Sequence, residues 1–185
     1  VEAGREIDSA EWMVGEAAPL PFAAGTFSLV LTRYSFHHFR APSEVMVEMV
    51  RVCRPGGRVV VADVSLPAEK VAAYDELELL RDPSHVHALS RDEFAEAFAG
   101  SGLGDVRFAE YKVDFALEDQ LAASFPVEGG AEKIRAMMRQ DVGVDRLGVN
   151  AREEDGVLRY TVQNGGGGGR KAAGGEGREA GGREG

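Results

Sequence analysis

The fold is decided by residues 29–63, which read LVLTRYSFHHFRAPSEVMVEMVRVCRPGGRVVVAD. Two apolar runs, Leu29–Leu31 and Val59–Ala62, are typical of strands buried on both faces of a parallel sheet. Between them, residues 42–53 carry apolar side chains at helical spacing, with a proline in the first turn. Residues 54–57, RPGG, then end the helix and turn the chain back. The stretch predicts one right-handed β-α-β unit.

Strands and helices alternate on both sides of this unit. Upstream, Glu11–Val14 indicates a strand, with Trp12 in the core. Downstream, the sequence SRDE at residues 90–93 has the spacing of a capping box and opens a helix. Further elements are expected as helices at 68–80, 91–99, 117–123 and 131–139, and strands at 106–111 and 157–162. The fold class is therefore α/β with an open, mostly parallel sheet.

The length of 185 residues fits one domain of roughly 150 residues with an extension. Residues 165–185 hold 11 of the 24 glycines and no Leu, Ile, Val or Phe. Such a composition does not build a hydrophobic core. We expect a folded domain at residues 1–164 and a disordered, glycine-rich tail at 165–185.

Composition and charge exclude several classes of protein. The net charge of −10 and the pI near 4.9 argue against nucleic acid as a partner, because such surfaces need clustered Lys and Arg. No apolar run approaches the roughly 18 residues of a membrane span. The single cysteine, Cys53, cannot form an intrachain disulfide, and no secretory signal opens the chain. We expect a cytoplasmic protein; the sequence does not indicate its oligomeric state.

Four blocks carry a resemblance to a known family. They are GEAAPLPF at residues 15–22, FSLV at 27–30, HHF at 37–39 and EMVRVCRPGG at 48–57. In this order and spacing the sequence resembles the class I S-adenosylmethionine-dependent methyltransferases, and most closely the small-molecule type that includes quinone-biosynthesis C-methyltransferases. The resemblance implies a Rossmann-like, seven-stranded fold, S-adenosylmethionine as cofactor and a small-molecule methyl acceptor.

The resemblance also implies roles for individual residues. By position, Glu16 and Ala17 would line the adenine pocket of the cofactor. Arg33, Tyr34 and His38, after the next strand, match positions that face the methionine half of the cofactor. The RPGG turn is structural in the family.

One part of the family pattern has no counterpart in the sequence. The first strand and its glycine-rich loop would precede residue 11, where only ten residues stand. The resemblance therefore implies the carboxyl two-thirds of an amino-terminally truncated methyltransferase domain. The alternative is a non-catalytic remnant or a partner-binding subunit. A nicotinamide-dependent oxidoreductase would need a strand-loop-helix glycine fingerprint, which is absent.

Two histidines are candidate general bases, His37 in the HHF block and His85 in the DPSHVH loop at residues 82–87. Each has a plain alternative: His37 can serve packing, and His85 can belong to a loop that only covers the substrate. A metal site is not expected, because histidines two residues apart point the same way only on a strand. The acidic residues of the 68–80 helix indicate a solvated face; they are Glu69, Asp75, Glu76 and Glu78.

Overall fold

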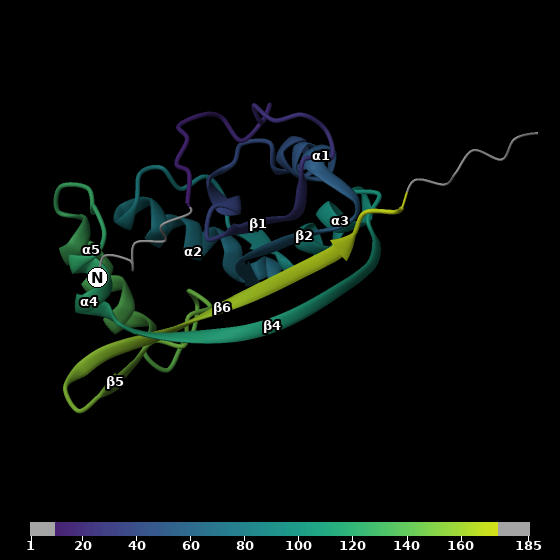
Figure 1. The fold of residues 1–185 in the computed structure, drawn as a ribbon. Coiled ribbons are helices and arrows are strands. Elements are labelled where there is room, and N and C mark those ends of the chain that lie inside the picture. The colour runs from purple at the N-terminus through teal and green to yellow at the C-terminus, as the bar shows by residue number, and fades with distance from the viewer. Residues whose placement is uncertain (1–9, 174–185) are drawn as a thin grey trace, which may run out of the picture.

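The computed structural model describes residues 10–173, and Figure 1 shows their fold. No helix within this range has the length and apolarity needed to cross a membrane. The elements, in chain order, are β1 (Phe27–Arg33), η1 (Phe36–His38), α1 (Pro42–Val52), β2 (Cys53–Leu66), α2 (Ala68–Arg81), β3 (Leu89–Ser90), α3 (Arg91–Ala99), β4 (Gly104–Ala116), α4 (Leu117–Ala122), α5 (Gly130–Asp141), β5 (Arg152–Glu154) and β6 (Val157–Arg170).

The main sheet has the strand order β1-β2-β6-β4. The pairs β1–β2 and β2–β3 are parallel, whereas β6 runs antiparallel to β2, β4 and β5. The last strand in the sequence therefore lies inside the sheet, between β2 and β4. The α/β class and the central β-α-β unit, formed by β1, α1 and β2, are confirmed.

The start of β2 depends on glycine. Gly56 has a φ of +74°, a conformation that other residues rarely adopt. A Cβ atom on Gly57 would lie 2.7 Å from the sulfur of Cys53 and 2.9 Å from the carbonyl oxygen of Ser28. The RPGG sequence is thus required by the close approach of β1, as the β-α-β prediction implies.

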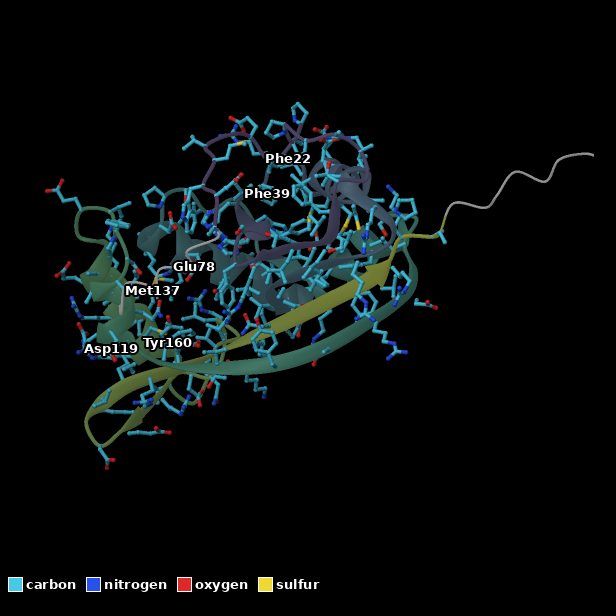
Figure 2. The ribbon with its side chains drawn as sticks, in the orientation of Figure 1. Phe22, Phe39, Glu78, Asp119, Met137 and Tyr160 are labelled. Carbon is cyan, nitrogen blue, oxygen red and sulfur yellow. The ribbon has the colours of Figure 1, made fainter. Side chains whose placement is uncertain are left out.

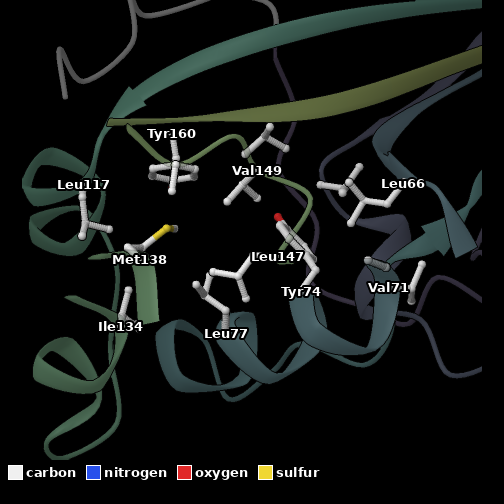
Figure 3. Close-up of a cluster of buried hydrophobic side chains, with 14 of the residues drawn as sticks. Leu66, Val71, Tyr74, Leu77, Leu117, Ile134, Met138, Leu147, Val149 and Tyr160 are labelled. Atoms are coloured by element: carbon white, nitrogen blue, oxygen red, sulfur yellow. The ribbon is translucent and has the colours of Figure 1, made fainter. Parts of the chain in front are cut away.

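Two hydrophobic cores hold the sheet. Odd-numbered residues of β2, Val59 and Val61, pack with α1 and α3 on one face. Even-numbered residues nearer the end of the same strand, Val64 and Leu66, pack on the other face with α2, α4 and α5. Figure 3 shows the second cluster, with Tyr160 of β6 among side chains from these helices. In Figure 1, α4 and α5 lie at one end of the long β4–β6 pair, and α1 and α3 near the other.

The expected strand at Glu11–Val14 is wrong. These residues form no strand, and Trp12 is 94% exposed instead of lying in the core. The three consecutive apolar residues, Trp12–Val14, suit a strand, but a strand needs a hydrogen-bonding neighbour, and none of the described strands pairs with this segment.

The expected boundary between domain and tail is also wrong. Gly165–Gly169 belong to β6 and pair with β2 on one side and β4 on the other. Glycine is unfavourable in strands, but Gly167 lies beneath the rings of Phe98 of α3 and Phe108 of β4. A Cβ on Gly167 would lie 2.5 Å from a ring carbon of Phe98. Neighbouring aromatic rings replace the missing side chains. Residues 174–185 of the expected tail lie outside the described residues.

Lys171 extends the folded part of the chain beyond the glycines. Its main chain pairs with Gly56 and Gly57, at 2.9 Å and 3.0 Å. Its ammonium nitrogen donates to the carbonyl oxygens of Val50 and Cys53, both at 2.8 Å. These carbonyls end α1, so the lysine satisfies acceptors that the helix itself leaves unpaired.

Two neighbouring glycines of β6 should respond in opposite ways to valine. Gly167→Val should lower the free energy of unfolding by about 1–3 kcal/mol, because the new side chain meets the ring of Phe98. Gly166→Val should be neutral or stabilise by up to about 1 kcal/mol, because its nearest atoms are 3.8 Å away and valine favours strands. Urea unfolding measures both. Equal stability of the two variants would contradict the placement of β6.

Candidate functional site

A cavity of about 370 Å³ lies at the carboxyl ends of β1 and β2, where ligands bind in open α/β sheets. One wall comes from η1 and the residue that follows β1, and another from α2. Figure 2 shows Glu78 of α2 and Tyr160 of β6, two of the lining residues. The lining consists of Tyr34, His37, His38, Val64, Tyr74, Glu78, Arg81, Asp82, Phe115, Gln120, Tyr160 and Val162.

Asp63 is the anchor of this site. Its carboxylate is fully buried at the end of β2 and accepts hydrogen bonds from the backbone N–H groups of Phe36 at 2.6 Å and Val64 at 2.7 Å. Its Oδ1 atom also lies 2.5 Å from Nδ1 of His37. Sequence analysis did not single out Asp63. Its signal was its position as the first polar residue after the run VVVA, at the mouth of a buried strand.

The surroundings of Asp63 fix the tautomer of His37. The carboxylate oxygens of Asp63 already accept backbone N–H groups, and a carboxylate acts as an acceptor towards its other neighbours as well. Nδ1 of His37 therefore carries the proton and donates it, so that Nε2 of the neutral ring keeps a free lone pair. Because His37 lines the cavity, the site holds a group able to accept a proton there.

The backbone before His37 brings its ring to this place. Tyr34 has a φ of +52°, which turns the chain sharply at the end of β1. Phe36 is then buried in the core and packs edge-on against Phe39, with ring centroids 5.7 Å apart. The buried phenylalanine fixes the short helix η1, so that His37 and His38 face the loop after α2.

The loop at residues 82–88 is fastened to η1 by hydrogen bonds. The N–H groups of Val86 and His87 both donate to the carbonyl oxygen of His37, at 3.0 Å and 3.1 Å. Nδ1 of His38 lies 3.0 Å from the carbonyl oxygen of Ser84. Both candidate histidines of the HHF block are thus held by the DPSHVH loop, which sequence analysis had placed over the substrate.

Asp75 of α2 holds the far end of the same loop. It accepts hydrogen bonds from Nε2 of His85 at 2.7 Å, Nδ1 of His87 at 2.9 Å and the N–H group of Ala88 at 2.8 Å. Burial alone would raise the pKa of Asp75, but these bonds outweigh it and hold the pKa below its usual value. Burial would likewise lower the pKa of His87, and its bonds to Asp75 and Glu93 raise it instead.

The position of His85 favours support of the loop over contact with a reactant. Its ring is fully buried, is bound to Asp75, and lies outside the cavity lining, with its centroid 5.5 Å from that of His37. Within residues 10–173, its Nδ1 atom has no hydrogen-bond partner. No group of three or more His, Cys, Asp or Glu in this range is arranged to hold a metal ion.

The residues suggested for cofactor binding fall into two groups. Tyr34 and His38 line the cavity, and the guanidinium of Arg33 stacks over the ring of Tyr34 at 4.6 Å. The hydroxyl of Tyr34 is buried and, within the described residues, has no hydrogen-bond partner. Glu16 is exposed and Ala17 packs against the core beside α1, so neither reaches the cavity.

The acidic residues of α2 are not all solvated, contrary to the expectation. Glu78 is 3% exposed and pairs with Arg81, whose Nε atom lies 3.0 Å from both carboxylate oxygens. Arg81 also donates to the hydroxyl of Ser124 at 3.0 Å. Both charged residues line the cavity. Glu78 and Arg81 are three residues apart on one helix face, a spacing that indicates an ion pair. Ion pairs exposed to solvent have the same spacing, so it does not predict burial.

The chain is similar in sequence to known methyltransferases. The profile of the family described as "Methyltransferase domain" matches residues 2–61. The "Uncharacterized protein YafE" of Escherichia coli is 32% identical over 123 residues, which are 65% of this chain and 56% of that protein. The "Ubiquinone/menaquinone biosynthesis C-methyltransferase UbiE" of Roseobacter denitrificans is 38% identical over 64 residues, 35% of this chain and 26% of that protein.

A solved structure shares the fold. The crystal structure of a putative methyltransferase from Bacillus halodurans superposes with a TM-score of 0.75 and 22% identity, covering 86% of this chain and 70% of that chain. The chain spans about half the length of YafE, and less of UbiE.

The protonation of His37 can be observed directly. We expect the neutral ring of His37 to carry its proton on Nδ1, because Asp63 accepts it, and to leave Nε2 bare. Long-range proton–nitrogen correlation spectra of the chain labelled with ¹⁵N-histidine assign Nδ1 and Nε2 of the ring. Asp63→Asn should remove the preference, since an amide offers a donor as well as an acceptor. A proton on Nε2 in the unaltered chain would contradict the assignment.

His87 should make stability depend on pH. Its folded-state pKa lies above the ordinary value of 6.5, so its contribution is complete below that pH and is lost as the pH rises through the folded-state pKa. We expect His87→Ala to destabilise the chain more at about pH 6 than at about pH 8. Urea unfolding of both proteins at both pH values measures this. An equal loss at the two values would exclude the raised pKa.

Proposed function

We propose that the protein, which is similar in sequence to class I S-adenosylmethionine-dependent methyltransferases, transfers a methyl group to a small-molecule acceptor held in the cavity beside His37. The observation that carries the proposal is the pair of Asp63 and His37 at the cavity wall. Nε2 of His37 can accept a proton beside the place that the methyl-accepting molecule would occupy. Cys53, buried and unpaired, is compatible with the cytoplasmic location that we infer.

The described residues fit one end of S-adenosylmethionine. The buried hydroxyl of Tyr34 offers a polar partner to the methionine end, and aromatic rings at the cavity suit a cationic sulfonium. We infer that Tyr34 and His38 would hold this end, with Arg33 supporting Tyr34. Glu16 and Ala17 lie apart from this cavity, and we infer that they would line the adenine pocket beside it.

The chemistry divides between cofactor and protein. When bound, the cofactor supplies a methyl group made electrophilic by the sulfonium sulfur. The protein orients the acceptor, and such orientation contributes on the order of 7–11 kcal/mol in favourable cases. If the acceptor atom bears a proton, Nε2 of His37 accepts it as the new bond forms. Asp63 then stabilises the imidazolium through the bond at Nδ1.

The lining restricts the acceptor. Tyr74, Phe115 and Tyr160 give the cavity aromatic walls, and the charges of Glu78 and Arg81 cancel each other. A site of this kind suits a small neutral or enolic molecule with a flat apolar part. Gln120 and the N–H groups of Arg81 not used by Glu78 or Ser124 remain for its polar atoms.

His37 can be tested with deuterium-labelled S-adenosylmethionine and a small-molecule extract. Mass spectrometry should detect labelled products, and His37→Ala should form them about 10²–10⁴-fold more slowly, because a general base is lost. Arg139→Ala, on the far α5 helix, is the matched control and should leave the rate unchanged. Full activity of His37→Ala would exclude His37 as the general base. The absence of any labelled product would contradict the proposed methyl transfer.

A further inference from the structure

The ion pair of Glu78 and Arg81 in the cavity presents its cation and hides its anion. The side chain of Arg81 keeps 22% of its area exposed, whereas that of Glu78 keeps 4%. Nε of Arg81 lies 3.0 Å from both carboxylate oxygens of Glu78, and Nη2 donates to one of them as well. Asp82, the other carboxylate of the lining, accepts hydrogen bonds from the N–H and the hydroxyl of Ser84. A ligand in the cavity therefore meets the guanidinium more readily than either carboxylate.

Two N–H groups of Arg81 remain for a ligand. A guanidinium has five N–H groups. Nε and Nη2 each give one to Glu78, and Nη1 gives one to the hydroxyl of Ser124 at 3.0 Å. That hydroxyl donates its own proton to the carbonyl oxygen of Gln120, so it acts as an acceptor towards Arg81. Among residues 10–173, one N–H of Nη1 and one of Nη2 are left without a partner, on a group that is held in place from two sides.

Two tyrosines add further donors near this pair. Tyr74 of α2 and Tyr160 of β6 line the cavity, and Figure 3 shows both rings, with the hydroxyl of Tyr74 pointing away from α2. Burial raises the pKa of both phenols, and the negative charge of Glu78 raises both further. Both hydroxyls therefore keep their proton and can donate it. We call Arg81, Tyr74 and Tyr160 the donor wall.

We propose that the donor wall binds an oxygen atom of the methyl acceptor that becomes negatively charged in the reaction, so that the acceptor is a hydroxy or enolisable carbonyl compound and not an amine. The role of this oxygen rests on the proposed methyl transfer. When Nε2 of His37 accepts a proton from a hydroxyl, or from the carbon beside a carbonyl, the electron pair stays on the acceptor and its charge falls on the oxygen. Donors fixed in advance around such an oxygen stabilise that charge.

The arrangement of the cavity allows one molecule to meet both groups. His37 lies on the wall formed by η1, and Arg81 lies on the wall formed by α2. An acceptor with a flat apolar part between them can present its oxygen to the donor wall. An amine would instead gain positive charge as it gains the methyl group, and the guanidinium would repel it.

Three flat probes of similar size test the donor wall without methyl transfer. 4-Nitrophenolate carries an anionic oxygen, 4-nitrotoluene has a methyl group in its place, and 4-nitrobenzylammonium is a cation. NMR titration of the chain with each probe, where the phenol is ionised, gives the three dissociation constants. The phenolate should bind about tenfold or more tightly than either of the others, because only its oxygen accepts charge-assisted hydrogen bonds.

Two variants should move the affinity for the phenolate in opposite directions. Glu78→Gln keeps a hydrogen-bond acceptor for Arg81 but removes the neighbouring negative charge, so the phenolate should bind more tightly. Glu78→Gln combined with Arg81→Gln leaves no unpaired buried charge and should abolish the preference for the phenolate over 4-nitrotoluene. Arg139→Ala is the matched control and should change neither. Circular dichroism checks that each variant is folded.

Several outcomes would overturn the proposal. They are no binding of the phenolate, equal binding of the phenolate and 4-nitrotoluene, tighter binding of the ammonium probe, or a preference that the double variant keeps. A phenolate preference that depends on Arg81, together with no labelled product in the methyl-transfer assay, would support the oxygen site and contradict methyl transfer alone. The two proposals can therefore fail separately.

Discussion

A single buried carboxylate ties together the parts of this molecule that matter for function. Asp63 ends the apolar part of β2 and accepts hydrogen bonds from the first residues of η1, which follows a different strand. Burying an unpaired charge would be costly, so the loop after β1 must adopt the conformation that brings its N–H groups and His37 to the carboxylate. The loop at residues 82–88 and Asp75 then close around the same helix turn.

Local signals predicted what local interactions decide. The β-α-β unit, α3 with its capping box, and the bounds of α2, α4 and α5 follow from spacing and turn residues that act within one element. Partners distant in the sequence decided the rest. Trp12 is exposed because no described strand pairs with its segment, and Gly165–Gly169 form a strand because β2 and β4 supply its hydrogen bonds. The high glycine content indicates a low intrinsic tendency to form a strand, but it does not reveal the neighbouring strands that overcome this tendency.

The candidate site was predicted in part for the same reason. His37, His38 and Tyr34 were found from one strand-end loop, and the structure brings all three to the cavity. Asp63 and the buried pair of Glu78 and Arg81 were missed, because burial of a charged residue depends on elements that pack from elsewhere. The resemblance to methyltransferases accounts for the fold and for the loop after β1.

The position of β6 sets the order of events during synthesis. Among the described strands it is made last, yet it separates β2 from β4, so these strands cannot join into one sheet before about residue 170 has left the ribosome. Until then β2 has only parallel neighbours, and the apolar side chains that later contact β6 remain exposed to water. Such long-range pairing is slow and leaves strand edges exposed in the meantime. A chain that lacks β6 therefore exposes strand edges and apolar side chains that the complete sheet covers.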